Sequence, residues 1–175
     1  MENITITELN ADELPDSLND LADILHASVQ TGASVGFILP YSMNDARAFW
    51  REKVFLPVKN GGRVLLVARL DDRFVGTVQL DIDLLPNQRH RGEVAKLLVH
   101  PDFRGRGIAK RLMGALEKRA RDLGRCLLTL DTRTGDDAEP LYRSLGYQAA
   151  GVIPGYCRAA EDDRYDSTTY MYKAL

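Results

Sequence analysis

A phosphate-binding turn is the strongest chemical signal in this sequence. Residues 104–107 read Arg-Gly-Arg-Gly and directly precede a stretch of helical periodicity that begins at Ile108. Glycine has no Cβ, so its backbone can approach a ligand closely. The first turn of a helix presents unpaired N–H groups at the positive end of its dipole. These features predict a site for phosphate or pyrophosphate. The alternative is a tight strand-to-helix turn whose arginines are only solvated.

The spacing of the glycines limits the kind of phosphate ligand. A dinucleotide fingerprint, G-x-G-x-x-G, would need a third glycine where Lys110 stands, and the G-K-[ST] end of a P-loop is absent. What remains is Arg104-x-x-Gly107-x-Ala109, preceded by the run Lys-Leu-Leu-Val-His-Pro at 96–101.

Other patterns that suggest chemistry have simpler explanations. Residues 32–36 fit the nucleophile elbow G-x-S-x-G, but a helical stripe precedes them where that elbow needs a strand. No metal spacing joins the three histidines, and the two cysteines form no CxxC pair, so neither a metal site nor a disulfide framework is predicted. The basic residues after 104 surround an apolar stripe, so we interpret them as a solvated helix face rather than a nucleic-acid site.

The elements that position the turn follow from hydrophobic periodicity. The expected order is β-α-α-β-β-β-α-β-α-β-β, with helices on both faces of an open mixed sheet. Strands are expected at 4–7, 63–70, 74–84, 93–99, 126–130, from 147 onward and at 168–171. Helices are expected at 14–29, from a cap at Ser42 or Asn44 to about 58, from the turn to about 123, and at 136–145.

Length and composition predict one folded domain spanning residues 1–175. The chain is 45% hydrophobic and 27% charged, which excludes a disordered chain, and its net charge of −2 excludes a general polycation. No apolar run is long enough to span a membrane. The acidic, polar N-terminus and the lack of a cysteine framework predict a cytoplasmic protein. Its oligomeric state cannot be predicted from the sequence.

The run KLLVHPDFRGRGIAKRLM, at 96–113, resembles the acyl-coenzyme A signature R/Q-x-x-G-x-G/A of the GNAT superfamily of N-acetyltransferases. Ala109 stands where many members have glycine. The element order and the segments at 138–142 and 145–147 resemble the family as well. Within the superfamily, the stretches at 32–37, 92–99, 127–132 and 154–157 are similar to those of tabtoxin-resistance acetyltransferases.

This resemblance implies an α/β fold of mixed α+β type, with a mostly antiparallel sheet of about seven strands flanked by about four helices. It implies acetyl-coenzyme A as cosubstrate, with no metal. The strands at 93–99 and 126–131 would part, and the pantetheine arm would fill the gap. Backbone groups of Leu98 and Val99 would bind the pantetheine amides. The residues expected at the pyrophosphate are Arg104, Gly105, Arg106, Gly107, Ile108 and Ala109.

The resemblance also suggests groups that move protons. An alkyl amine must lose a proton before it is acetylated, which costs roughly 4–5 kcal/mol at pH 7. Glu93 and Asp131, on the strands that flank the gap, are candidates for the base. The alternatives are that Glu93 pairs with Arg91 and that Asp131 caps the turn at 132–134. Tyr142 is expected near the thioester, as donor to the leaving thiolate and as a cofactor contact, unless it only packs in the core.

The acceptor is expected to be a small amine, such as an amino-acid-like toxin or antibiotic, bound against Phe37 and Tyr156. A protein or peptide amine is the alternative acceptor, and a coenzyme A-binding module without catalysis is the alternative to an enzyme. Because no nucleophilic side chain is suggested, transfer is expected to be direct, in a ternary complex. No nucleic-acid or membrane partner is expected.

Overall fold

The protein, described here from a computed structural model for residues 4–175, is built on one seven-stranded sheet. The strands are β1 (Ile4–Glu8), β2 (Arg63–Leu70), β3 (Arg73–Asp81), β4 (Arg91–Val99), β5 (Leu127–Arg133), β6 (Gln148–Arg158) and β7 (Tyr165–Ala174). They lie in the order β1-β2-β3-β4-β5-β7-β6. Neighbours are antiparallel except for β4 and β5, which are parallel. The expected mixed, mostly antiparallel sheet is therefore confirmed.

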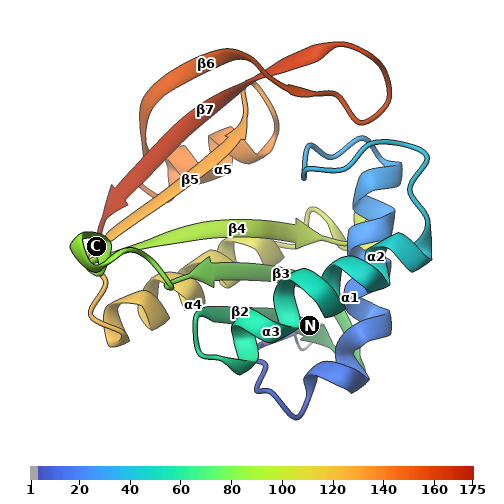
Figure 1. Cartoon of the computed structure of the whole chain (residues 1–175), viewed down its shortest axis with the longest axis horizontal. Helices are drawn as coiled ribbons and strands as arrows, with labels where there is room; N and C mark the ends of the chain where they lie inside the picture. Colours follow the sequence, from blue (N-terminus) through green and yellow to red (C-terminus); the bar gives the residue numbers. More distant parts are fainter. Residues whose placement is uncertain (1–3) are drawn as a thin grey trace.

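Helices cover both faces of this sheet (Figure 1). α1 (Leu14–Gln30) and α2 (Met43–Phe49) lie on one face, and α4 (Ile108–Asp122) and α5 (Ala138–Ser144) lie on the other. α2 continues through a π-helical turn, Trp50–Val54, into α3 (Phe55–Lys59). The predicted helix that ends near residue 58 is therefore one segment with a local irregularity, and the described chain has the four helical segments that were expected.

Ser42, rather than Asn44, caps the second helical segment. The N–H of Asp45 donates to Ser42 Oγ at 3.1 Å, and the N–H of Ser42 donates to the Asp45 carboxylate at 2.9 Å. This reciprocal pair is a capping box, which satisfies two N–H groups that the first turn would leave unpaired.

Alternating side chains of the central strands build two cores, one on each face. Along β2, Val64 and Leu66 pack in the core beneath α4, whereas Leu65 and Val67 pack in the core beneath α1. A strand that is buried on both faces is apolar almost throughout, which explains why residues 63–70 read as a continuous hydrophobic run.

β5 is longer than the strand that was predicted to end at residue 130. It extends to Arg133 because every residue from Leu127 to Arg133 pairs with β7. Asp131 therefore lies inside a strand, opposite Tyr170, and the alternative in which it caps a turn at 132–134 is wrong.

Candidate functional site

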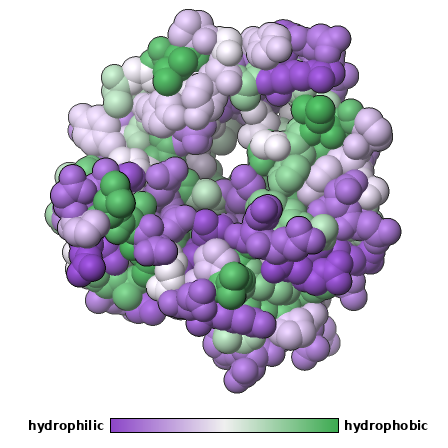
Figure 2. All heavy atoms as spheres, in the orientation of Figure 1, coloured by the Kyte–Doolittle hydropathy of each residue, from purple (hydrophilic) through white to green (hydrophobic). Residues whose placement is uncertain are grey.

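The sheet opens between β4 and β5. The two strands pair only at their first residues, Arg91–Leu127, Gly92–Leu128 and Glu93–Thr129, and then diverge (Figure 1). Figure 2 shows a hollow at the middle of this view, between the part of the chain that holds β5–β7 and the part that holds β1–β4. Beyond Glu93, β4 has no strand partner on its β5 side. Its backbone polar groups there can pair with a ligand instead.

The register against β3 decides which residues of β4 face this opening. The N–H of His100 donates to the carbonyl of Val75 at 2.9 Å. Hydrogen-bonded pairs alternate with non-bonded pairs in an antiparallel ladder, so Leu98 directs its backbone groups at β3 and Val99 directs its own into the opening. The carbonyl of Val99 indeed accepts from Arg104 Nε, at 3.3 Å. Val99 is thus better placed than Leu98 to bind a ligand through its backbone, while the Leu98 side chain is buried beside α1.

The arginine-glycine turn leads from this strand into α4. Gly105 and Gly107 adopt left-handed φ values of 77° and 74°, and a Cβ on either would meet no atom within 4 Å. The turn is thus an open cradle in a conformation that favours glycine. The N–H groups of Ile108, Ala109 and Lys110 have no helical carbonyl to pair with. The N–H of Arg104 already donates to the carbonyl of Pro101, at 3.3 Å, so the amides at the start of α4 fit a pyrophosphate better.

Glu93 and Asp131 lie on the same face of the sheet, the one that carries α1 and α2. Glu93 pairs with Thr129, and Asp131 lies two residues further along β5, so their side chains project to one side. Asp131 accepts a hydrogen bond from Thr168 Oγ at 3.0 Å. Glu93 forms an ion pair with Arg91 at 3.4 Å, as the alternative interpretation expected, but its side chain is still 52% exposed. Both carboxylates therefore remain open to a ligand.

Tyr170 and Tyr156 stand beside these carboxylates. The two hydroxyl oxygens are 2.8 Å apart, and this hydrogen bond is the main cause that raises the pKa of Tyr170 to about 12. Burial and the negative charges of Asp131 and Glu93 add to the shift. The Tyr170 phenol therefore stays protonated at neutral pH, and the two hydrogen-bonded tyrosines form an aromatic wall next to the two carboxylates.

Tyr142 extends from α5 into the core on the opposite face of the sheet. Its side chain is 6% exposed and packs edge-on against Tyr147, with ring centroids 5.7 Å apart. Burial raises the pKa of the Tyr142 phenol, and the charge of Asp131 adds to the shift. The Tyr142 hydroxyl is therefore a protonated donor at neutral pH. The core packing that was considered as an alternative is real, and it also fixes the side chain in place.

An aromatic cluster borders the opening on the α2 side. Phe37, in the loop between α1 and α2, has its ring centroid 4.7 Å from that of Tyr41 and 5.1 Å from that of Phe49. Ser34 Oγ in the same loop lies 3.6 Å from Cys157 Sγ of β6. The two segments expected to shape an acceptor pocket, 32–37 and 154–157, therefore meet in the fold. Residues 32–36 follow a helix rather than a strand, so they do not form a nucleophile elbow.

Lys96 is a site residue that sequence reasoning missed. A β-bulge interrupts β4, because Thr77 pairs with Leu98 but Gln79 pairs with Ala95, and Lys96 adopts a φ of 51°. Its ammonium lies 5.9 Å from the ring centroid of Phe37 and 5.6 Å from that of Phe49. Burial lowers the pKa of Lys96, an effect that Asp131 opposes. The only signal in the sequence was a lysine in the middle of an apolar strand.

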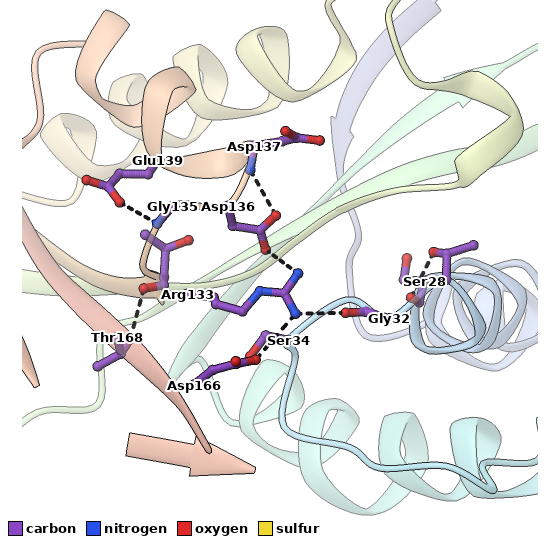
Figure 3. A network of polar contacts seen from close by, with 12 residues as sticks. Ser28, Gly32, Ser34, Arg133, Gly135, Asp136, Asp137, Glu139, Asp166 and Thr168 are labelled. Carbon is purple, nitrogen blue, oxygen red and sulfur yellow. Dashed lines mark hydrogen bonds and ion pairs between the residues drawn. The ribbon is translucent and has the colours of Figure 1, made fainter. Parts of the chain in front are cut away.

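Arg133 joins the two loop regions that border the opening (Figure 3). Its guanidinium donates to the carbonyl of Gly32 at 3.1 Å and pairs with Asp136 at 3.2 Å and Asp166 at 3.6 Å. The group borders a cavity of about 510 Å³. The end of β5 is thereby fixed to the loop that follows α1 and to the start of β7.

This network predicts a measurable loss of stability on substitution. Asp166 is largely buried and pairs with two guanidinium groups, that of Arg133 at 3.6 Å and that of Arg164 at 3.2 Å. Replacing Arg133→Met removes one of these two cations and the hydrogen bond to Gly32, and should lower the free energy of unfolding by about 1–3 kcal/mol. Arg119→Met is the matched control, since the Arg119–Glu8 pair is solvent-accessible and should contribute less than about 1 kcal/mol. Urea unfolding measures both. Equal losses in the two variants would contradict a structural role for the Arg133 network.

Neither a metal centre nor a membrane-spanning helix is found in the described part of the chain. Within residues 4–175, no group of three or more His, Cys, Asp or Glu side chains could hold a metal ion. In the same part of the chain, no helix has both the length and the apolar character needed to cross a membrane.

Comparisons with known proteins agree with this geometry. The sequence model described as the Acetyltransferase (GNAT) family matches residues 28–147. An uncharacterized N-acetyltransferase from the hisH-hisA intergenic region of Azospirillum brasilense is 30% identical over 142 residues, or 80% of this chain and 82% of that protein.

Two solved structures share the fold at low sequence identity. The ribosomal-protein-alanine N-acetyltransferase from Brucella melitensis has a TM-score of 0.77 at 22% identity, over 98% of this chain and 99% of that one. The Salmonella typhimurium protein yncA, described as an acetyltransferase and solved with its cofactor acetyl-CoA, has a TM-score of 0.76 at 19% identity, over 99% and 94% of the two chains.

Proposed function

This chain belongs to the GNAT family of acetyltransferases, and on that premise we propose that it transfers the acetyl group of acetyl-CoA to a primary amine of a small molecule. The observation that carries the proposal is the opening between β4 and β5. The open turn at Gly105 and Gly107, which suits a phosphate group, lies where the opening meets α4. The carboxylates of Glu93 and Asp131 lie on the opposite face of the sheet. Such an arrangement lets a phosphate-bearing donor enter from one face of the sheet and an amine from the other.

The residues of the α4 side fit coenzyme A. The open turn at Gly105 and Gly107, with the first-turn amides of α4, provides donors for the pyrophosphate. Arg104 and Arg106 add positive charge beside it. The backbone of Val99 faces the opening and can pair with a pantetheine amide, whereas the backbone of Leu98 faces β3 and its side chain is buried beside α1. When bound, acetyl-CoA supplies a thioester, whose carbonyl carbon accepts the amine.

The carboxylates and the phenol carry the protons of the reaction. A C–N bond forms as the C–S bond breaks, the amine gives up a proton, and the departing thiolate takes one. Asp131 or Glu93 accepts the amine proton, directly or through a water molecule. Tyr142, held protonated by burial on the other face, donates to the thiolate. We propose direct transfer in a ternary complex, without an acetylated intermediate on the protein.

Replacing Tyr142→Phe should slow transfer without weakening acetyl-CoA binding. The phenyl ring keeps the packing against Tyr147, whereas the proton donor is lost. Loss of a positioned acid typically lowers turnover by about 10²-fold or more. Thiol release measures turnover, and calorimetry measures affinity. Tyr147→Phe is the matched control, because it removes a neighbouring buried hydroxyl that has no proposed role. Equal turnover in wild type and Tyr142→Phe would remove Tyr142 from the mechanism.

The residues on the α1/α2 side of the opening support a small amine as the acceptor. This side carries the aromatic ring of Phe37 and the paired phenols of Tyr156 and Tyr170, and the charges of Asp131 and Glu93 act on Tyr170. This suits a compact cationic amine, and the resemblance of segments 32–37 and 154–157 to tabtoxin-resistance acetyltransferases points to an amino-acid-like compound. A peptide N-terminus is the second candidate, since the Brucella protein of the same fold is described as acting on a ribosomal-protein alanine.

A panel of acceptors tests the proposal. Purified protein is incubated with acetyl-CoA and with either free amino acids and amino-acid-like antibiotics or short peptides. Thiol release gives the rate, and mass spectrometry identifies the acetylated product. Turnover of small amines supports the proposal. If peptides are acetylated readily while small amines neither react nor inhibit at millimolar concentration, the acceptor is a peptide. Tight acetyl-CoA binding with no product from any acceptor indicates a binding module without catalysis.

A further inference from the structure

We propose that Lys96 binds a carboxylate of the acceptor, so that the preferred acceptors are amino acids rather than simple amines. The inference rests on the proposed function, because it assumes a small-molecule acceptor in the opening between β4 and β5. The Lys96 ammonium has no role in the proposed acetyl transfer, and this inference gives it a ligand.

The backbone places Lys96 where an acceptor would bind. The bulge in β4 puts Lys96 in the left-handed region, at φ 51°, a conformation that is strained for any residue with a Cβ. The bulge adds a residue to β4 beside Leu98 and Val99, at the opening itself. Glycine would relieve the strain, yet the position holds a long cationic side chain. The strained conformation brings that side chain to the aromatic cluster of the α2 side.

The ammonium of Lys96 has donors to spare. It lies 5.9 Å from the ring centroid of Phe37 and 5.6 Å from that of Phe49, and no carboxylate within residues 4–175 lies within ion-pair distance of it. An ammonium carries three N–H donors, and ring faces attract its charge without satisfying those donors. Burial lowers the pKa of Lys96 and the charge of Arg63 lowers it further, against the opposing effect of Asp131. An anionic group of a ligand would supply the missing acceptor atoms.

The opposite charges in the opening are arranged as a zwitterion requires. Asp131 acts electrostatically on Lys96, but the two side chains form no ion pair. Asp131 and Glu93 face the proposed position of the reacting amine, and Lys96 follows Glu93 by three residues on β4, with its ammonium on the α1/α2 side of the sheet. An amino acid carries one ammonium and one carboxylate close together, so it can contact the carboxylates and Lys96 at once. A simple alkylamine would leave Lys96 without a partner.

Matched acceptors that differ only in the carboxylate test this role. Wild-type protein, Lys96→Met and Lys96→Gln are assayed with each of the twenty L-amino acids and with the corresponding carboxamides. For wild type, kcat/KM for the amino acid should exceed that for its carboxamide by about 10- to 100-fold, the range for a hydrogen bond between charged groups. Both variants should lose this preference through a higher KM for the amino acid, with little change for the carboxamide.

Controls separate binding of the carboxylate from other effects. Lys118→Met removes an exposed lysine of α4 and should leave both acceptors unchanged. Unchanged affinity of the Lys96 variants for acetyl-CoA shows that they are folded. Equal kcat/KM of wild type for acid and carboxamide would overturn the role of Lys96 while the proposed function stands. So would an equal loss of turnover for both acceptors in Lys96→Met, which would indicate proton transfer instead. Acetylation of peptides alone would overturn the proposed function and this inference together.

Discussion

Gly107→Asp is expected to remove measurable acetyl-CoA binding from a protein that still folds. Gly107 caps α4 with a left-handed φ of 74°, and the space beside its Cα is open. An aspartate there would project a carboxylate into the cradle where the pyrophosphate is proposed to bind. Two like charges about 4 Å apart near a protein surface repel by about 4 kcal/mol. Because each 1.4 kcal/mol changes affinity tenfold, we expect a loss of at least about 100-fold, measured by calorimetry.

Two control variants isolate the charge from the backbone strain. Gly107→Ala adds a Cβ at the same left-handed position without a charge, and it should bind acetyl-CoA better than Gly107→Asp. Gly124→Asp introduces the same side chain at a second open, left-handed glycine, with φ 70°, at the far end of α4, and it should bind normally. Unchanged affinity in folded Gly107→Asp would refute the phosphate site. Tighter binding of duplex DNA than of coenzyme A by wild type would favour a nucleic-acid role for the basic residues around α4.

Asp131→Asn should have the larger effect of the two carboxylate variants. The charge of Asp131 influences the pKa values of both Lys96 and Tyr142, so it acts on groups that come from both faces of the sheet. Glu93 is engaged by Arg91 instead. If Asp131 is the base, thiol release should fall by about 10²- to 10⁴-fold while affinity for acetyl-CoA is unchanged. Glu93→Gln should lower turnover less.

The pH profile distinguishes loss of a base from loss of shape. Without a base, only acceptor amines that have already lost their proton can react. Below the pKa of the amine, the unprotonated fraction rises tenfold for each unit by which the pH increases. The deficit of Asp131→Asn should therefore shrink as pH rises. Asp122→Asn, at the exposed end of α4, should follow the wild-type profile. Wild-type turnover in both Asp131→Asn and Glu93→Gln would leave positioning of the substrates as the source of catalysis.

The parts of the fold that follow from local sequence were predictable. Periodicity identified every strand and the four helical segments, because a two-residue or 3.6-residue repeat reports directly which faces are buried. The turn at Gly105 and Gly107 was also visible, since two glycines before a helical stripe indicate left-handed backbone at an exposed helix start. The expected parting of the strands at 93–99 and 126–131 came from the family resemblance, and the register of β4 and β5 confirms it.

The parts that depend on long-range register were not predictable. The placement of Asp131 inside β5 requires the pairing with Tyr170, about forty residues later, which no local pattern reports. The bulge at Lys96 arises because β4 has one more residue than β3 over the same length of the ladder, and the sequence of either strand by itself does not show this difference. Likewise, Arg133 reaches Gly32, 101 residues away, so its role emerges only from the assembled fold.

A crystal structure of the protein with acetyl-CoA tests the central claim most directly, because it locates the donor in the opening or elsewhere. We predict that the pyrophosphate lies within hydrogen-bonding distance of the first-turn amides of α4, and that the sulfur lies between Val99 and Tyr142. Coenzyme A bound away from this opening, for example in the cavity of about 340 Å³ that Leu56, Gly61 and Arg125 help to line, would contradict the account.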